Sequence, residues 1–178
     1  MSTYFGGNNM DNKKLQWCFG LKDGLKIEES NERLAKSYLE EAKASLKRAE
    51  KNFADGDLLW TTVVVYYAEY YALYSFLQKI GLKCENHSCS ILTADFLLGE
   101  EKTKTINQHK DKRVDAQYYM RIDKREKVEA MVQEAKQFVV EFDILVSSLS
   151  DEEIEKHRIK MKDFKCAIDQ ANKERRRT

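Results

Sequence analysis

The sequence predicts an all-α fold, and three observations carry that prediction. Proline is absent from the 178 residues, and glycine occurs only seven times. Residues that favour helices, above all Ala, Leu, Glu and Lys, are abundant. The segment from Asp57 to Gly81 is apolar nearly all round, and such a helix is buried by neighbours on more than one side. We therefore expect one helical domain organised around a central helix.

The two ends of this apolar segment carry helix boundary signals. Asp57 can cap the first turn, and Gly81 can take the left-handed conformation after the last. Small residues recur at Ala68, Ala72 and Ser75, where another helix can approach closely. Large side chains mark a second stripe at helical spacing: Tyr67, Tyr70, Tyr71, Tyr74 and Leu77.

A membrane span is the alternative for this segment, because its apolar character lasts about 20 residues, the length that a bilayer requires. Glu69 lies mid-segment, and the tyrosines crowd the centre rather than the ends. A central carboxylate is costly in lipid, and aromatic belts belong at the interfaces. We therefore expect no membrane span. We interpret Glu69 as a carboxylate at the solvent edge, and the alternative is a face that a terminal arm or a second subunit covers.

Three segments make up the predicted organisation. Residues 1–30 form an irregular N-terminal arm, in which Leu15, Trp17, Phe19 and Leu21 alternate with other residues as in an extended chain. Residues 31–148 form the helical bundle, and residues 149–178 form an amphipathic helix with a basic tail.

Within the bundle, a first helix starts at Ser30 or Asn31 and Gly56 separates it from the central helix. A short apolar helix follows over residues 88–98. Residues 99–112 are charged and weakly patterned, which predicts a mobile surface loop or a frayed helix. A long helix capped by Asp123 then runs to about residue 148.

The C-terminal helix opens with a capping-box pattern from Ser150 to Glu153. Apolar residues recur along it with a heptad spacing over barely three repeats. This seam predicts either docking on the body of the protein or a dimer interface. The basic residues at its end are favoured there by the helix dipole and need no nucleic acid.

Composition excludes several classes of function. The net charge is +1, which gives no general attraction to nucleic acid or to membranes.

No secretory signal is visible at the N-terminus, so we expect a cytoplasmic protein with free thiols at Cys18, Cys84, Cys89 and Cys166. The sequence has no P-loop, no glycine-rich dinucleotide motif and no nucleophile elbow, and we expect no cofactor.

One loop offers soft metal ligands at Cys84, His87 and Cys89. A zinc site requires a fourth ligand, which only the distant Cys18 or Cys166 could supply. We expect no metal there, and a site built on these three residues is the alternative.

A set of short patterns runs through the bundle in a fixed order. Tyr67–Ala72 (YAEYYA) leads to Phe76–Leu77 and to Gly81, and His87–Ser88 follows; Arg113–Tyr118 (RVDAQY) precedes the last long helix. In these patterns residues 31–148 resemble the HEPN superfamily, particularly its small prokaryotic branch. The branch carries an acid where this chain has glutamine, just before the last tyrosine of the set.

This resemblance implies an up-and-down bundle of four to five core helices, commonly a homodimer. Many HEPN proteins are metal-independent ribonucleases, in which an Arg is followed four to six residues later by a His. No Arg precedes His87, His109 or His157 in that way. Other members lack the motif and bind partners or ligands, often beside a minimal nucleotidyltransferase.

The predicted function is therefore a non-catalytic HEPN-like module that dimerises and binds a partner, a minimal nucleotidyltransferase in a toxin–antitoxin-like or regulatory pair. The alternative is a ribonuclease with a non-standard site, which pairs His87 or His109 with Arg113. A nucleotide-binding helper is a further alternative. Nucleic acid is a possible partner that the sequence does not favour.

The polar positions that match the family are His87, Arg113 and Tyr118. They fall on segments that should be neighbours in the bundle. Together they could hold a phosphate or a nucleotide, with Arg113 as the bidentate donor. The alternative is a structural hydrogen-bond network that joins loop to helix.

Overall fold

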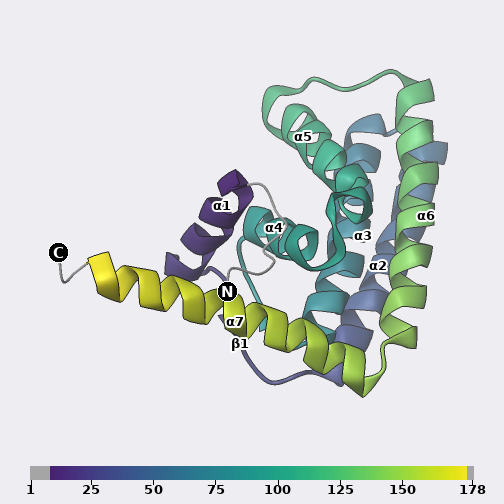
Figure 1. Ribbon diagram of the computed structural model, residues 1–178. Helices are drawn as coiled ribbons and strands as arrows, with labels where there is room; N and C mark the ends of the chain where they lie inside the picture. The colour runs from purple at the N-terminus through teal and green to yellow at the C-terminus, as the bar shows by residue number, and fades with distance from the viewer. Residues whose placement is uncertain (1–8, 176–178) are drawn as a thin grey trace.

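A computed structural model describes residues 9–175, with side chains from Lys13 onward (Figure 1). Within this range the chain is all-α, as predicted. The α-helices are α1 (Asn9–Gly20), α2 (Glu32–Ala54), α3 (Leu58–Lys79), α4 (His87–Leu98), α5 (Lys104–Tyr119), α6 (Arg125–Ser148) and α7 (Asp151–Arg175). The short elements are a 3-10 turn η1 (Glu100–Lys102) and two paired strands, β1 (Lys26–Ile27) and β2 (Leu82–Lys83).

The central helix α3 organises the bundle, as its apolar sequence predicts. It packs against α2, α4, α5 and α6, and most of its side chains are buried. The predicted N-caps of α2 and α3 are present. The Asn31 side chain accepts a hydrogen bond from the N–H of Leu34, and the Asp57 side chain accepts one from the N–H of Trp60. Gly81 has a φ of +73°, the left-handed conformation expected after the last turn.

The N-terminal segment differs from its prediction. The segment expected to be extended is helical to Gly20, so its side chains follow helical rather than strand periodicity. Leu15 and Cys18, three residues apart, are buried, whereas Trp17 is 55% exposed. Within residues 9–30 the one strand is β1, whose two residues pair with β2 in antiparallel register. The prediction for residues 1–8 lies outside the described part of the chain.

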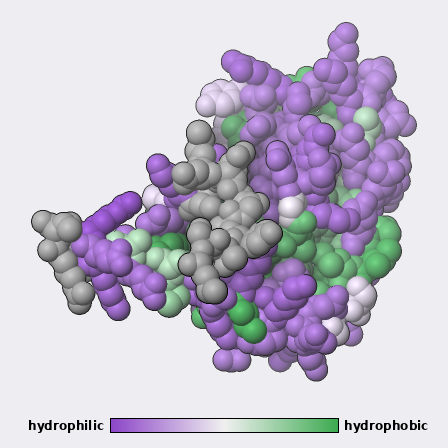
Figure 2. All heavy atoms as spheres, in the orientation of Figure 1, coloured by the Kyte–Doolittle hydropathy of each residue, from purple (hydrophilic) through white to green (hydrophobic). Residues whose placement is uncertain are grey.

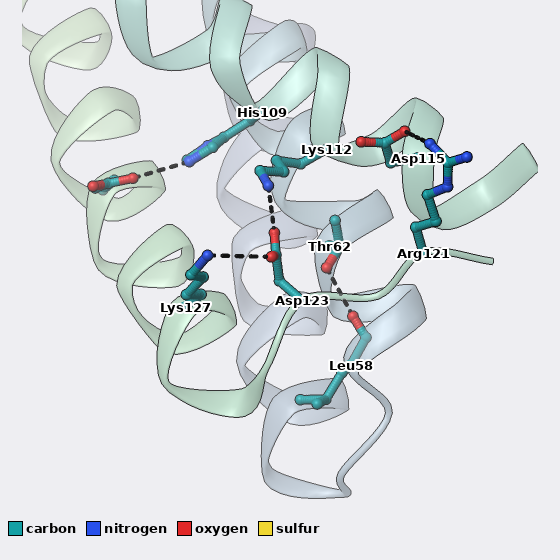
Figure 3. Close-up of polar contacts among 9 residues, drawn as sticks. Leu58, Thr62, His109, Lys112, Asp115, Arg121, Asp123 and Lys127 are labelled. Atoms are coloured by element: carbon teal, nitrogen blue, oxygen red, sulfur yellow. Dashed lines mark hydrogen bonds and ion pairs between the residues drawn. The ribbon is translucent and has the colours of Figure 1, made fainter. Parts of the chain in front are cut away.

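Residues 99–112 also differ from their prediction. Most of them belong to η1 and α5, and Ile106 and His109 are fully buried. The buried face of α5 includes His109, and a sequence pattern counts histidine as polar. The amphipathic pattern of this helix is therefore not visible in the sequence. Asp123 does not cap α6, which begins at Arg125. It forms ion pairs with Lys112 at 2.8 Å and Lys127 at 3.7 Å instead, and so joins α5 to α6 (Figure 3).

The last helix, α7, docks on the body, which is one of the two outcomes that its seam predicts. The capping box is present: the Ser150 N–H donates to the Glu153 carboxylate at 2.8 Å, and the Glu153 N–H donates back to Ser150 Oγ at 3.3 Å. Met161 and Phe164 are buried in the core. Arg158 reaches across the helix ends, where its Nη1 donates to the carbonyls of Glu28 and Ile80, each at 2.9 Å.

Among the helices within residues 9–175, none combines the length and the apolar character that crossing a membrane requires.

We predict that Gly81→Ala destabilises the protein by about 2–4 kcal/mol, since strain and overpacking add together. A Cβ at Gly81 would lie 1.9 Å from Arg158 Nη1 and 2.6 Å from the Glu28 carbonyl oxygen. Gly56→Ala is the matched control: its φ is +83°, but a Cβ there meets nothing within 4 Å. Its cost should be strain alone, about 1–2 kcal/mol. Urea unfolding followed by circular dichroism measures both, and equal losses would contradict the tight docking of α7 over Gly81.

Candidate functional site

The structure brings the three family-matching residues together around two neighbouring tyrosines of α3. His87 Nδ1 and the Tyr66 hydroxyl share a hydrogen bond of 2.8 Å, and Arg113 Nη2 donates to the Tyr67 hydroxyl at 3.0 Å. The guanidinium carbon of Arg113 lies 5.5–5.6 Å from the ring centres of Tyr66, Tyr67 and Tyr118. We call these five residues the Arg113 cluster. That the cluster binds a ligand remains a prediction.

The first turn of α4 fixes the position of His87. Asn86 caps this helix by accepting the N–H of Cys89 at 3.0 Å, so His87 is not itself the cap. The imidazole stacks on the Tyr70 ring with centroids 3.8 Å apart and planes at 10°. Ser90, one turn along α4, contacts the Tyr70 hydroxyl at 3.2 Å. The ring of His87 therefore cannot turn without disturbing α3.

Burial and the nearby cation keep His87 neutral. Desolvation lowers the pKa of His87, and the positive charge of Arg113 lowers this pKa further. Burial also raises the pKa of the Tyr66 hydroxyl, which stays protonated at neutral pH. The cluster thus holds one fixed positive charge, on Arg113, amid neutral aromatic groups. Such a site suits an anion or the face of an aromatic ring.

Two polar atoms of α5 beside this charge have no hydrogen-bond partner within the described residues. They are Arg113 Nε, a donor, and Gln117 Oε1, an acceptor, and both are buried. The two side chains lie on successive turns of one helix. Buried polar atoms of this kind usually bond to a protein group or to ordered water, so this donor and acceptor can hold a water or the polar group of a ligand.

A second polar group lies one turn before Arg113 on α5. His109 is 2% exposed, and its Nδ1 contacts Glu69 Oε1 at 2.7 Å while its Nε2 contacts Glu134 Oε2 at 2.9 Å. Figure 3 shows the imidazole pointing across to α6. The interpretation of Glu69 as a solvent-edge carboxylate is wrong, because this side chain is fully buried. The face that carries it is covered by α5.

The protonation of this group follows from its contacts. Burial acts to lower the pKa of His109, but the bonds and charges of Glu69 and Glu134 outweigh it and raise the pKa above its ordinary value. Burial raises the pKa of Glu69, and this effect exceeds the opposing effect of the hydrogen bond and charge of His109. An imidazolium can donate from both ring nitrogens, which is what two carboxylate partners require. His109 therefore ties α3, α5 and α6 together, and neither of its nitrogens is available to a substrate.

The cysteine predictions need correction. Cys18 and Cys89 form a disulfide, so two of the four expected free thiols are oxidised. Cys84 is a buried free thiol and Cys166 is an exposed one. With Cys89 bonded to Cys18, the loop cannot present Cys84, His87 and Cys89 as three ligands. Within the described residues no group of three or more His, Cys, Asp or Glu side chains is arranged to hold a metal ion.

The protein is an all-α helical bundle with an arginine–tyrosine–histidine cluster between its central helix, α4 and α5. The family model of the HEPN domain matches residues 35–145, well over half of the chain. The protein therefore belongs to the HEPN family. No curated protein and no solved structure gave a significant match.

Sequence reasoning missed Tyr66, Gln117 and the pairing of Glu69 with His109. Tyr67 belongs to the stripe of large side chains on the central helix, but its hydroxyl also accepts from Arg113, and the hydroxyl of the neighbouring Tyr66 is bonded to His87. One signal in the sequence points to the polar face of α5. His109 and Arg113 are four residues apart, so if residues 104–119 are read as a helix they share a face.

We predict that the free energy of unfolding falls as the pH rises above about 6.5. The pKa of His109 is raised in the folded protein, so the folded state holds a proton that the unfolded chain releases near pH 6.5. This stabilisation is complete below that pH and is lost as the pH rises through the folded pKa. Glu69→Gln, which removes the charge that raises the pKa, should flatten this dependence.

Urea unfolding at a series of pH values measures the effect, and His157→Gln is the matched control. Burial lowers the pKa of His157, so its removal should leave the fall above pH 6.5 in place. A profile that stays unchanged in Glu69→Gln would contradict an imidazolium at position 109.

Proposed function

We propose that this protein is a binding module of the HEPN family that dimerises, binds a protein partner and does not cleave RNA. The partner class in this proposal is a minimal nucleotidyltransferase of a toxin–antitoxin-like or regulatory pair, which follows from the family resemblance. The observation that carries the proposal is an exposed apolar surface where α5 ends, described below.

The histidines support a non-catalytic role. His109 is buried with both ring nitrogens bonded to carboxylates. His157 lies edge-on to the Phe76 ring, with centroids 5.4 Å apart, and is half-buried. His87 shares the Tyr66–Tyr67 pair with Arg113, and its Nδ1 is hydrogen-bonded to the Tyr66 hydroxyl. A general acid–base needs a nitrogen within reach of the substrate, and His109 does not offer one.

The connection from α5 to α6 exposes several large apolar side chains in a row, and we call it the α5–α6 corner. Their exposed fractions are 64% for Tyr118, 63% for Tyr119, 71% for Met120 and 44% for Ile122. Within residues 9–175, Met120 is the only non-glycine residue with a positive φ, at +54°. An exposed apolar patch of this kind marks an interaction surface. The positive φ of Met120 is a strained backbone conformation, and such conformations concentrate at functional sites. We propose this corner as the surface for the partner.

A second apolar surface lies on α6. Val140 and Ile144, one turn apart on its outer face, are 56% and 64% exposed. Figure 2 shows hydrophobic surface gathered over the C-terminal half of this helix. An i, i+4 apolar pair on a long, regular helix suits packing against another helix. We propose this stripe for self-association, and it is separate from the corner.

One observation favours the alternative of a ribonuclease. His87 and Arg113 both contact the Tyr66–Tyr67 pair, so the structure brings one His and one Arg into the same place. The spacing between them along the chain is unlike that of the family motif. A direct assay separates the two functions.

We predict that the purified protein leaves labelled single-stranded RNA intact in the presence of a chelator. His87→Ala, His109→Ala and Arg113→Ala should then match the wild type. Cleavage that disappears in His87→Ala or in Arg113→Ala would overturn the proposal and establish a ribonuclease with a displaced site. Light scattering on the same samples checks that the variants keep their oligomeric state.

We predict that the two surfaces can be separated by mutation. Ile144→Glu should weaken self-association about tenfold or more, since it places a charge in an apolar interface. Met120→Asp should weaken partner binding to a similar extent, and aspartate tolerates the left-handed backbone at this position. Light scattering measures the first, and co-purification with a co-expressed minimal nucleotidyltransferase measures the second. Each variant is the control for the other, and loss of both properties in one variant would indicate misfolding instead.

A further inference from the structure

The first helix is an appendage of the HEPN domain. It precedes the matched residues 35–145 and lies against α4 and α7 (Figure 1). Between positions 13 and 20 only Leu15 and Cys18 are buried, and Trp17 is 55% exposed. A twelve-residue helix is marginally stable on its own in water. Its place on the protein therefore depends on a small number of attachments.

The strongest of these attachments is covalent. Cys18 is bonded to Cys89 in the first turns of α4, across 71 residues of sequence, and both cysteines are 0% exposed. After α1 the chain turns tightly, with the Leu25 N–H donating to the Cys18 carbonyl at 2.9 Å. Gly24 permits this turn, because a Cβ there would lie 1.9 Å from the same carbonyl oxygen. The Asp23 carbonyl accepts from the N–H groups of Glu85 and Asn86, each at 3.1 Å, so the turn is the fixed base about which α1 can move.

The contact that α1 makes with α7 is partial. The ring of Phe19 lies 6.4 Å from that of Phe164, which in turn lies 4.9 Å from Phe96 of α4. Beside this contact an open groove of about 390 Å³ separates the two helices. Its apolar lining comes from Trp17, Phe19 and Ile168. Packing alone thus closes only part of the surface between α1 and the body.

We propose that the Cys18–Cys89 bond is a redox switch that holds α1 against α4 and α7, and that its reduction releases α1. In this step a dithiol reductant supplies two electrons and two protons. The protein S–S bond breaks, two thiols form at Cys18 and Cys89, and the reductant becomes a disulfide. Release turns α1 about residues 21–25 and uncovers the apolar surface around Phe164 and Phe96.

The other cysteines do not compete in this reaction. Cys84 is buried, its Sγ donates to the Asn86 carbonyl at 3.4 Å, and burial raises the pKa of its thiol, so it stays a poor nucleophile. Cys166 is exposed on the outer side of α7 and remains a free thiol. The switch therefore involves one pair of cysteines, which both belong to the α1–α4 contact.

Hydrogen exchange followed by mass spectrometry tests the proposal on the full-length protein, oxidised and then reduced with dithiothreitol. Peptide mapping without reductant should first identify the Cys18–Cys89 bond. Reduction should then speed exchange in α1 by about tenfold or more and leave α3 unchanged. Cys18→Ser should exchange rapidly in both conditions, and Cys166→Ser should behave as the wild type.

Three results would overturn the switch. The first is a mapped bond that pairs Cys89 with Cys84, or no bond at all after mild oxidation. The second is an unchanged exchange rate in α1 after reduction, which would show that packing alone holds the helix. The third is faster exchange in α3 as well, which would make the bond a brace for the whole fold.

Discussion

A single buried carboxylate on the central helix decides the arrangement of its neighbours. The Glu69 side chain is 0% exposed on a helix that is otherwise almost entirely apolar. A charge or proton-sharing group at that depth needs a partner, and removing one member of a buried pair costs about 3–5 kcal/mol. His109 supplies the partner from α5 and at the same time contacts Glu134 of α6. Three helices are thereby fixed in register by one imidazole.

The candidate site follows from that register. Arg113 lies one turn beyond His109 on α5, so docking the histidine over Glu69 places the guanidinium over Tyr66 and Tyr67. The aromatic rings shield the positive charge of Arg113 without neutralising it. The Tyr67 hydroxyl accepts a hydrogen bond from one guanidinium nitrogen, Nη2. The result is a cation held in an aromatic setting at the end of the bundle that also carries the exposed α5–α6 corner. A binding role for this end is consistent with both features.

The two terminal helices are held on the bundle by different means. Arg158 anchors α7 by donating to two backbone carbonyls, next to a glycine that leaves room for the guanidinium. The attachment of α1 is covalent, through Cys18. Hydrogen bonds to carbonyls do not respond to redox conditions, whereas a disulfide does. The attachment of α1 therefore responds to reduction, whereas that of α7 does not.

The sequence by itself determined the all-α class, the central helix with its caps at Asp57 and Gly81, the capping box of α7 and the family. Local propensity, periodicity and end signals are properties of short stretches, so they can be read without a structure. Tertiary structure decided the helical state of residues 9–20 and 104–112, the burial of Glu69, the Cys18–Cys89 bond and the meeting of His87 with Arg113. These features depend on partners far away in the chain, and a buried polar residue looks like a solvated one until its partner is known.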